Sequence, residues 1–302
     1  MKKQKFTRFA ALGGLGNQFF CFFAGLSLSK KYGIPLQIDL NPYGFQNSPH
    51  DSNLGDLELP GNQIFIESGS SKLRSFFIRI ARKIALHSSC SRFFINQTLG
   101  IYFSRSLGFD SRLDGIGSRR IVYGYFQTWR YFYEVKDNFR GSISLKIPSN
   151  WYLEKLDEIL GSIPVVVHIR RGDYLEQKDS LGVLSSEYFK NVIESLPSIY
   201  CNREIWIFSD DIGGLERDFE DFLPKRVRMI DSTQANSATE SLLLMSKGAV
   251  IVISNSTFSY WSAMLSDEGA QIYAPNKWYK NMEDPIDLIP PGWNLCQSLW
   301  VS

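Results

Sequence analysis

The sequence has little cysteine and little histidine, with four cysteines and three histidines in 302 residues. The cysteines lie far apart and form no CxxC pair, and the histidines are equally scattered, so a zinc site is not expected. Sparse cysteine usage also fits a reducing cytoplasm better than an oxidising compartment. We therefore expect a cytoplasmic protein that needs no metal ion.

The sequence also lacks a large excess of charge of either sign. Its 33 Lys and Arg against 31 Asp and Glu give a formal net charge of +2, which argues against a dedicated nucleic-acid binder. Long apolar runs are missing too. The MKKQK start resembles a signal peptide, but glycines and polar residues interrupt the apolar stretch after it, and the apolar run at 19–28 is too short to cross a bilayer. We predict neither a signal peptide nor a transmembrane helix.

Short apolar strands alternate with helical patterns along the chain. Residues 9–40 indicate a strand, a glycine-rich turn, a helix that opens near Asn17 and a second strand. Further strands are predicted at 165–167, 205–208 and 250–253, and helices at 186–196, 239–247 and 258–265. This alternation is typical of an α/β protein with parallel, doubly wound sheets. The length favours two domains, which we divide at residues 1–150 and 151–302.

The segment HIRRGDY at 168–174 directly follows the apolar run 163–167. In open α/β sheets ligands bind at the carboxyl ends of strands, and the planar fork of arginine matches phosphate oxygens. Arg170 and Arg171 therefore indicate an anion site, with His168 and Asp173 beside them. An internal ion pair between Arg171 and Asp173 explains the same residues equally well.

Polar residues also follow the two other predicted strands. Asp210 and Asp211 can form hydrogen bonds to a base, a ribose or the loop itself, and two adjacent carboxylates are weak support for a metal site. In the segment SNSTFSYW, Asn255, Ser256 and Thr257 stand where a strand leads into a helix. They can cap that helix, or bind phosphate oxygens together with its free N–H groups.

The glycine-rich turn GGLGNQ precedes the first predicted helix. Gly14 and Gly16 allow a ligand to approach the backbone closely, and Asn17 lies at the helix N-terminus, where anions are favoured. The segment is not the dinucleotide motif GxGxxG, and a plain tight turn accounts for it as well.

The aromatic segment IVYGYFQTWRYF spans residues 121–132. Aromatic rings with a few polar groups suit the faces of sugar rings, so Tyr125, Gln127 and Trp129 are candidate ligands of a carbohydrate. An ordinary aromatic core is the stronger alternative.

Residues 72–94 (KLRSFFIRIARKIALHSSCSRFF) are basic and apolar at helical spacing. Such a helix can lie on an anionic membrane surface. A surface helix that packs one face on the core is the favoured interpretation, and peripheral contact with the inner face of a membrane is the alternative.

Five motifs, GGLGNQFF, GYFQTWRYF, HIRRGDY, FSDD and SNSTFSYW, occur in this order within residues 8–265. In this respect the chain resembles the bacterial α-1,2-fucosyltransferases, glycosyltransferase family 11. The resemblance implies a GT-B-like fold of two Rossmann-type domains facing a central cleft. Residues 1–150 would form the acceptor-side domain and 151–302 the GDP-sugar domain, with a tail able to pack back on the first. The implied reaction is inverting transfer of fucose from GDP-β-L-fucose to the 2-hydroxyl of a terminal galactose, in surface polysaccharide such as O-antigen, without cofactor or metal.

The resemblance also implies site roles. Arg170 would meet the β-phosphate and His168 the nucleoside, with Asp173 the first candidate for the catalytic base and His168 the second. The implied donor ligands are Gly14, Gly16, Asn17, Arg171, Asp210, Asp211, Glu240, Asn255, Ser256 and Thr257. The candidate acceptor ligands are Tyr125, Gln127 and Trp129.

One position departs from the family pattern. The family commonly has an acidic pair before the segment LMS, whereas this chain has Glu240 followed by Ser241. Recognition of the base is therefore the weakest of these assignments. A GDP-sugar transferase of another linkage and a non-catalytic nucleotide- or glycan-binding protein remain alternatives, and the sequence leaves the oligomeric state open.

Overall fold

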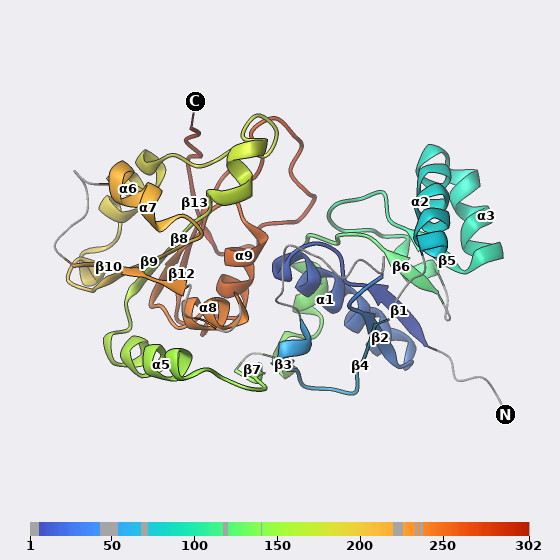
Figure 1. Cartoon of the computed structure of the whole chain (residues 1–302), viewed down its shortest axis with the longest axis horizontal. Helices are drawn as coiled ribbons and strands as arrows, with labels where there is room; N and C mark the ends of the chain where they lie inside the picture. The colour runs from blue at the N-terminus through green and yellow to red at the C-terminus, as the bar shows by residue number, and fades with distance from the viewer. Residues whose placement is uncertain are drawn as a thin grey trace. The chain divides into compact units, whose positions relative to one another are not determined.

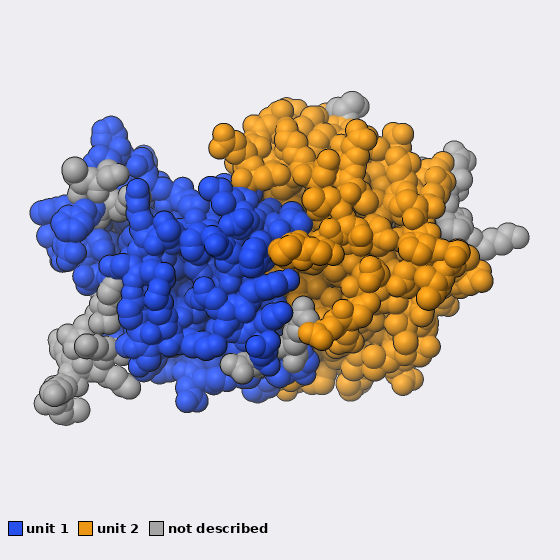
Figure 2. Space-filling model, turned by 180° about the vertical axis from the view of Figure 1, so that it is seen from behind, with its two compact units in different colours: residues 1–143, 285–289 blue, residues 144–284, 290–302 orange. Residues whose placement is uncertain are grey.

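The computed structural model describes residues 6–42, 54–67, 72–116, 120–139, 141–219, 226–232, 235 and 238–301. The chain forms two compact units, coloured separately in Figure 2. Unit 1 comprises residues 1–143 and 285–289, and unit 2 comprises residues 144–284 and 290–302. In the part of the chain that is described, no helix has both the length and the apolar character that a membrane crossing requires.

Unit 1 is built on a five-stranded sheet of order β4-β2-β1-β6-β5 in which every pair of neighbours is parallel (Figure 1). The strands and helices of unit 1 are β1 (Thr7–Ala10), α1 (Leu15–Tyr32), β2 (Leu36–Asp39), η1 (Leu54–Asp56), β3 (Leu57–Glu58), β4 (Ile64–Ile66), α2 (Lys72–His87), α3 (Ser89–Leu99), β5 (Ile101–Phe103), η2 (Leu113–Gly115), β6 (Ile121–Tyr123), α4 (Arg130–Tyr133) and η3 (Lys136–Asn138).

Helix α1 forms the core of unit 1 with the phenylalanines of its sequence. Phe19, Phe22 and Phe23 are fully or almost fully buried, and the ring of Phe23 lies 4.7 Å from that of Phe132 in α4. The helix ends at Gly33, which has a φ of 60° and donates its N–H to the carbonyl of Ser29. Only a residue that tolerates the left-handed region ends a helix in this way without strain. The predicted strand, turn, helix and strand at 9–40 are confirmed.

The basic segment at 72–94 differs from the prediction, because it forms two helices and not one. Helix α2 ends at His87, and Ser88 begins α3 by accepting a hydrogen bond from the N–H of Ser91 at 3.0 Å. A serine at this position satisfies a backbone donor that the helix leaves unpaired. Ile78, Ala81 and Ala85 of α2 are buried against the sheet, which confirms that one face of this helix packs on the core.

Unit 2 contains a six-stranded sheet of order β10-β9-β8-β11-β12-β13, again with every neighbouring pair parallel. The strands and helices of unit 2 are β7 (Ser144–Leu145), α5 (Asn150–Ser162), β8 (Val165–Ile169), η4 (Gly172–Gln177), α6 (Ser186–Glu194), η5 (Ser198–Tyr200), β9 (Ile205–Ser209), α7 (Ile212–Phe219), β10 (Val227–Ile230), α8 (Ala238–Met245), β11 (Val250–Val252), α9 (Thr257–Met264), β12 (Gln271–Pro275) and β13 (Asn294–Cys296).

Strand β8 is one of the two central strands of this sheet, and it is buried along its whole length. It pairs with β11 on one side, where Val165 lies opposite Val250, and with β9 on the other, where Val165 lies opposite Ile205. A continuous β-branched run suits a strand that is covered on both faces. The parallel sheet and the strands and helices predicted for residues 165–265 are confirmed, with ends that differ by one or two residues.

Candidate functional site

The strand order of unit 2 reverses between β8 and β11. The chain passes from β8 to β9 and β10 on one side, and from β11 to β12 and β13 on the other. The loops after β8 and β11 therefore lead away in opposite directions, and such a reversal is where open α/β sheets bind their ligands. The segments HIRRGDY and SNST are those two loops. The structure thus brings the two strongest sequence motifs to one edge of the sheet.

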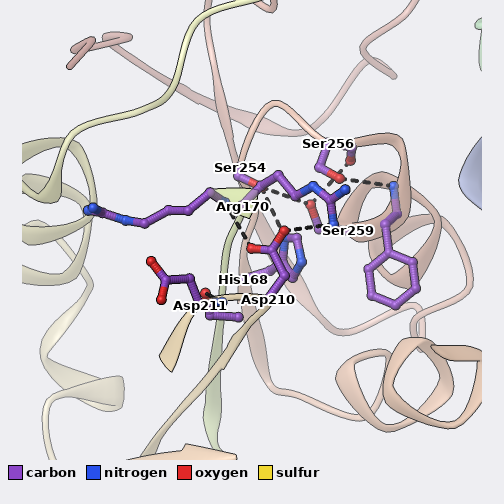
Figure 3. A network of polar contacts seen from close by, with 10 residues as sticks. His168, Arg170, Asp210, Asp211, Ser254, Ser256 and Ser259 are labelled. Atoms are coloured by element: carbon purple, nitrogen blue, oxygen red, sulfur yellow. Dashed lines mark hydrogen bonds and ion pairs between the residues drawn. The ribbon is translucent and has the colours of Figure 1, made fainter. Parts of the chain in front are cut away.

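Arg170 and Asp210 form an ion pair at this edge (Figure 3). The Nη1 of Arg170 lies 2.9 Å from the Oδ2 of Asp210, and the two side chains are 21% and 26% exposed. The other carboxylate oxygen of Asp210 accepts the backbone N–H of Arg171 at 2.9 Å. The ring of Tyr174 lies 5.5 Å from the guanidinium carbon of Arg170. Asp210 therefore fixes a guanidinium that still meets solvent, which is the arrangement an incoming anion needs.

His168 connects the two loops across the reversal point. Its Nδ1 lies 2.9 Å from the Oγ of Ser254, and Ser254 lies 3.5 Å from the Oγ of Ser259 on α9 (Figure 3). Burial of the ring, together with the nearby charge of Arg170, lowers the pKa of His168 to about 3. The imidazole is therefore neutral near pH 7 and a weak proton acceptor. This favours a role in positioning over the role of base that the sequence left open.

Acid should destabilise the protein through His168. Between pH 6.5 and about 3 the unfolded chain binds a proton at this residue and the folded chain does not, so stability falls as the pH falls. Going from pH 7.5 to 5.5, we expect the wild type to lose about 1.4 kcal/mol more unfolding free energy than His168→Asn. Urea titrations of both proteins at the two pH values check this. Equal losses in the two proteins would contradict it.

Residues of the SNST loop form contacts that stabilise the fold. Ser256 caps α9, accepting the N–H of Phe258 at 3.3 Å, and Thr257 is the first residue of that helix. The Nδ2 of the buried Asn255 donates to three backbone carbonyls, those of Leu181, Gly182 and Trp278. Capping thus accounts for Ser256, and anchoring of neighbouring segments accounts for the amide nitrogen of Asn255. Their roles as phosphate ligands stay predictions.

Asp211 lies beside Asp210 but has another partner. Its Oδ1 accepts the N–H of Gly214 at 3.0 Å in the first turn of α7. The backbone of Asp173 lies in η4, and its side chain falls outside the described part of the structure. Within the described ranges, no group of three His, Cys, Asp or Glu side chains could hold a metal ion.

Glu240 is fully buried at the start of α8 and holds the N-terminus of α5. Its Oε1 accepts the backbone N–H of Ser149 at 2.7 Å, and its Oε2 accepts the hydroxyl of Ser149 at 2.8 Å. Ser149 in turn caps α5 by accepting the N–H of Tyr152 at 3.1 Å. The carboxylate oxygens that were expected to meet the nucleotide thus connect two helices, and contact of Glu240 with a base stays a prediction.

Removing this carboxylate should cost stability. We expect Glu240→Ala to lower the unfolding free energy by about 3 kcal/mol, because a buried N–H and a hydroxyl lose their acceptor. Ser149→Ala is the matched variant and should cost about 1 kcal/mol, the value of an N-cap. Denaturant unfolding measures both. If Glu240→Ala kept full stability and only weakened donor binding, the contact with Ser149 would not be its main role.

In unit 1, β1 and β6 are neighbouring strands at the middle of the sheet. There the Nε2 of Gln127 donates to the Oδ1 of Asn17 at 2.9 Å, which joins the loop after β6 to the turn after β1. Gly14 is the N-cap of α1 without a side-chain cap, and Gly16 is buried in its first turn. Asn17 was predicted to bind the donor sugar nucleotide and Gln127 the acceptor sugar. The structure joins these two side chains by a hydrogen bond.

A cavity of about 120 Å³ lies near the carboxyl ends of β5 and β6. Tyr125 lines it, together with aromatic rings, serine hydroxyls and two guanidiniums from Phe103, Tyr123, Ser104, Ser106, Arg82 and Arg105. Trp129 instead packs edge-on against Tyr133, with ring centres 4.9 Å apart. Of the three candidate acceptor ligands, Tyr125 is the one that faces this cavity. The aromatic-core interpretation holds for Phe126, which is fully buried.

Sequence reasoning missed several members of these two sites. Ser259 donates its hydroxyl to the carbonyl of Ser256, and Ser262 donates to that of Ser259. Serines at a spacing of three on a predicted helix are a signal for this buried polar row. Arg82 and Arg105 lie 23 residues apart in the sequence and in different elements, so no local pattern indicates that they share a cavity.

Known proteins show extended similarity to this chain. The sequence profile described as "Glycosyl transferase family 11" matches residues 69–295. An α-1,2-colitosyltransferase of Escherichia coli is 28% identical over 288 residues, which cover 93% of this chain and 95% of that protein. A galactoside 2-α-L-fucosyltransferase of Caenorhabditis elegans is 22% identical over 93% of this chain and 76% of its own length.

Solved structures with the same fold are also known. NodZ, an α-1,6-fucosyltransferase from Bradyrhizobium whose crystals were soaked with GDP-fucose, superposes with a TM-score of 0.50. The alignment covers 87% of this chain and 93% of that chain, at 14% identity. At this level of identity the likeness concerns the fold, which is of the GT-B type and confirms the expected fold class.

Proposed function

Because the chain belongs to glycosyltransferase family 11 and is a glycosyltransferase, we propose that it transfers fucose from GDP-β-L-fucose to the 2-hydroxyl of a terminal galactose. Arg170 is the residue that carries this proposal. It is a guanidinium fixed by Asp210 at the reversal point of a parallel sheet and still partly open to solvent. A diphosphate is the anion that such a site suits best. The acceptor is proposed to belong to a surface polysaccharide.

The reaction then follows from the charges at the site. The acceptor hydroxyl attacks the anomeric carbon opposite the phosphate, the bond from that carbon to the phosphate oxygen breaks, and GDP leaves with the electron pair. Negative charge grows on the β-phosphate as this bond breaks, and Arg170 lies ready to stabilise it. The neutral His168 holds the two loops together and leaves the cationic role to Arg170.

The hydroxyl proton needs an acceptor. His168 is poorly suited because its pKa is about 3. Asp173 remains the predicted base, and the oxygens of the departing phosphate are the chemical alternative. On the basis of the family resemblance, the proposed donor ligands remain Gly14, Gly16, Asn17, Arg171, Asp210, Asp211, Glu240, Asn255, Ser256 and Thr257.

A donor panel tests this function. The protein is incubated with EDTA and a β-galactoside, together with GDP-fucose, GDP-mannose or GDP-colitose, and the released GDP is measured. We expect turnover with GDP-fucose despite EDTA, and a product whose NMR spectrum shows α-linked fucose on O2. The 2-deoxygalactoside is the matched control acceptor and should give none. Linkage at another hydroxyl, or activity that returns only with added divalent metal, would contradict the proposal.

Colitose is the second candidate sugar, favoured by the similarity to the E. coli colitosyltransferase over nearly the whole chain. Colitose is fucose without the 3-hydroxyl. A site that hydrogen-bonds this hydroxyl rejects the deoxy sugar by a factor of about 10⁴, whereas a site that ignores it discriminates weakly. The ratio of kcat/KM for the two donors therefore assigns the natural sugar.

A further inference from the structure

The α2 and α3 helices concentrate the positive charge of this protein. Residues 72–99 contain six Lys and Arg and no Asp or Glu. The rest of the chain has 27 basic against 31 acidic residues, which is a formal net charge of −4. A nearly neutral protein thus carries a strongly basic segment, and this segment forms two helices that pack on one another beside β5 (Figure 1).

Helix α2 has a second apolar face in addition to the one that packs on the core. Phe76, Ile80 and Ile84 recur at a spacing of four, with Phe77 next to them, so they lie on one side of the helix. All four are exposed, and Phe76 and Phe77 are 58% and 60% exposed. This stripe is distinct from the buried face of Ile78, Ala81 and Ala85, so the fold of unit 1 does not explain it.

Helix α3 adds further exposed apolar side chains. Phe93, Phe94 and Leu99 are 67%, 66% and 60% exposed, while Ile95 between them is buried. We call the exposed side chains of the two helices the α2–α3 surface, which consists of Phe76, Phe77, Arg79, Ile80, Lys83, Ile84, Phe93, Phe94 and Leu99. Exposed rings gathered in one segment mark an interaction site more strongly than single exposed apolar residues do.

The charge of this surface decides what binds to it. Apolar rings beside Lys and Arg, with no acidic residue in the segment, match a bilayer that exposes anionic headgroups over an apolar interior. A second copy of the chain that met this surface with its own α2–α3 surface would present the same positive charge and be repelled. We propose that the α2–α3 surface docks on anionic lipid bilayers, with the phenylalanines inserted at the level of the headgroups and Arg79 and Lys83 paired with lipid phosphates.

Sedimentation with vesicles tests this docking on the full chain. We expect binding to phosphatidylcholine vesicles that contain phosphatidylglycerol, little binding to phosphatidylcholine alone, and weaker binding as salt is added. Arg79→Ala combined with Lys83→Ala should weaken the partition coefficient about thirtyfold, because each basic residue near the surface contributes about fivefold. Phe76→Ser combined with Phe77→Ser should weaken it at least about tenfold.

Two isoleucines of unit 2 provide the matched control. Ile147 and Ile199 are 82% and 72% exposed, so Ile147→Ser and Ile199→Ser should leave vesicle binding unchanged. Circular dichroism and GDP release with a water-soluble galactoside check that the docking variants stay folded and active. Equal binding to neutral and anionic vesicles would overturn the proposal, as would variants that bind like the wild type. A wild-type dimer in sedimentation velocity, lost in the phenylalanine variant, without any vesicle binding, would assign the surface to self-association instead.

Discussion

Replacing Arg170 with alanine is expected to lower kcat about a thousandfold while the protein stays folded. The guanidinium is fixed by Asp210 at 2.9 Å and remains partly exposed, so its loss removes charge from the site more than packing from the core. A partly exposed ion pair contributes about 1 kcal/mol or less to stability, so the thermal midpoint should change little. Single-turnover kinetics with GDP-fucose and a thermal unfolding curve measure the two effects.

Arg228 offers the matched control for this experiment. It lies on β10 of the same sheet and forms an ion pair with Glu158, but not at the reversal point. Arg228→Ala should therefore keep the wild-type kcat. Arg170→Lys should recover only part of the loss, since an ammonium keeps the charge without the planar fork. Full activity in Arg170→Ala would remove this residue from the mechanism.

Adding a single methyl group at Gly172 is expected to lower kcat/KM about a hundredfold. A Cβ at this position would collide with the carboxylate of Asp210, the same group that holds Arg170 and the N–H of Arg171. Gly172→Ala should displace this carboxylate, and a displacement of about 1 Å at a catalytic group costs a factor of this size. Kinetics with GDP-fucose and the galactoside report it.

A double-mutant cycle shows whether Gly172 acts through Asp210. In an Asp210→Ala background there is no carboxylate to displace, so Gly172→Ala should cause little further loss. Gly213 provides the matched glycine, because a Cβ there meets no atom within 4 Å. Gly213→Ala should leave activity unchanged. Equal losses from Gly172→Ala in both backgrounds would place its effect elsewhere.

The sequence predicted the layers of this fold because each strand and helix carries its own signal. The β-branched run that becomes β8 predicts a buried strand, and Ser149 before Asn150 marks the start of α5 by its capping preference. The split between α2 and α3 was missed. Ser88 and Ser91 at a spacing of three were a readable sign of the second helix start.

Contacts between distant loops could not be predicted in the same way. That His168 meets Ser254 depends on β8 lying beside β11, and strand order is a property of the whole sheet. For Glu240, the family pattern indicates a nucleotide ligand, whereas its two oxygens accept from Ser149. A glutamate that is buried against the fold and a glutamate that contacts a ligand are the same residue in a sequence, so the sequence alone does not distinguish the two roles.

Two side-chain hydrogen bonds, each between the segments that follow neighbouring strands, have a consequence for the order of folding. Asn17 and Gln127 are 110 positions apart along the chain, and His168 and Ser254 are 86 apart. Neither hydrogen bond can form until strands from both halves of its sheet have paired, and such distant pairings form slowly. The loops that surround Arg170 therefore take their final positions late, after the helices that pack locally. With the donor bound at Arg170, as proposed above, binding of GDP during refolding would report the completed sheet of unit 2, whereas helical circular dichroism would rise before it.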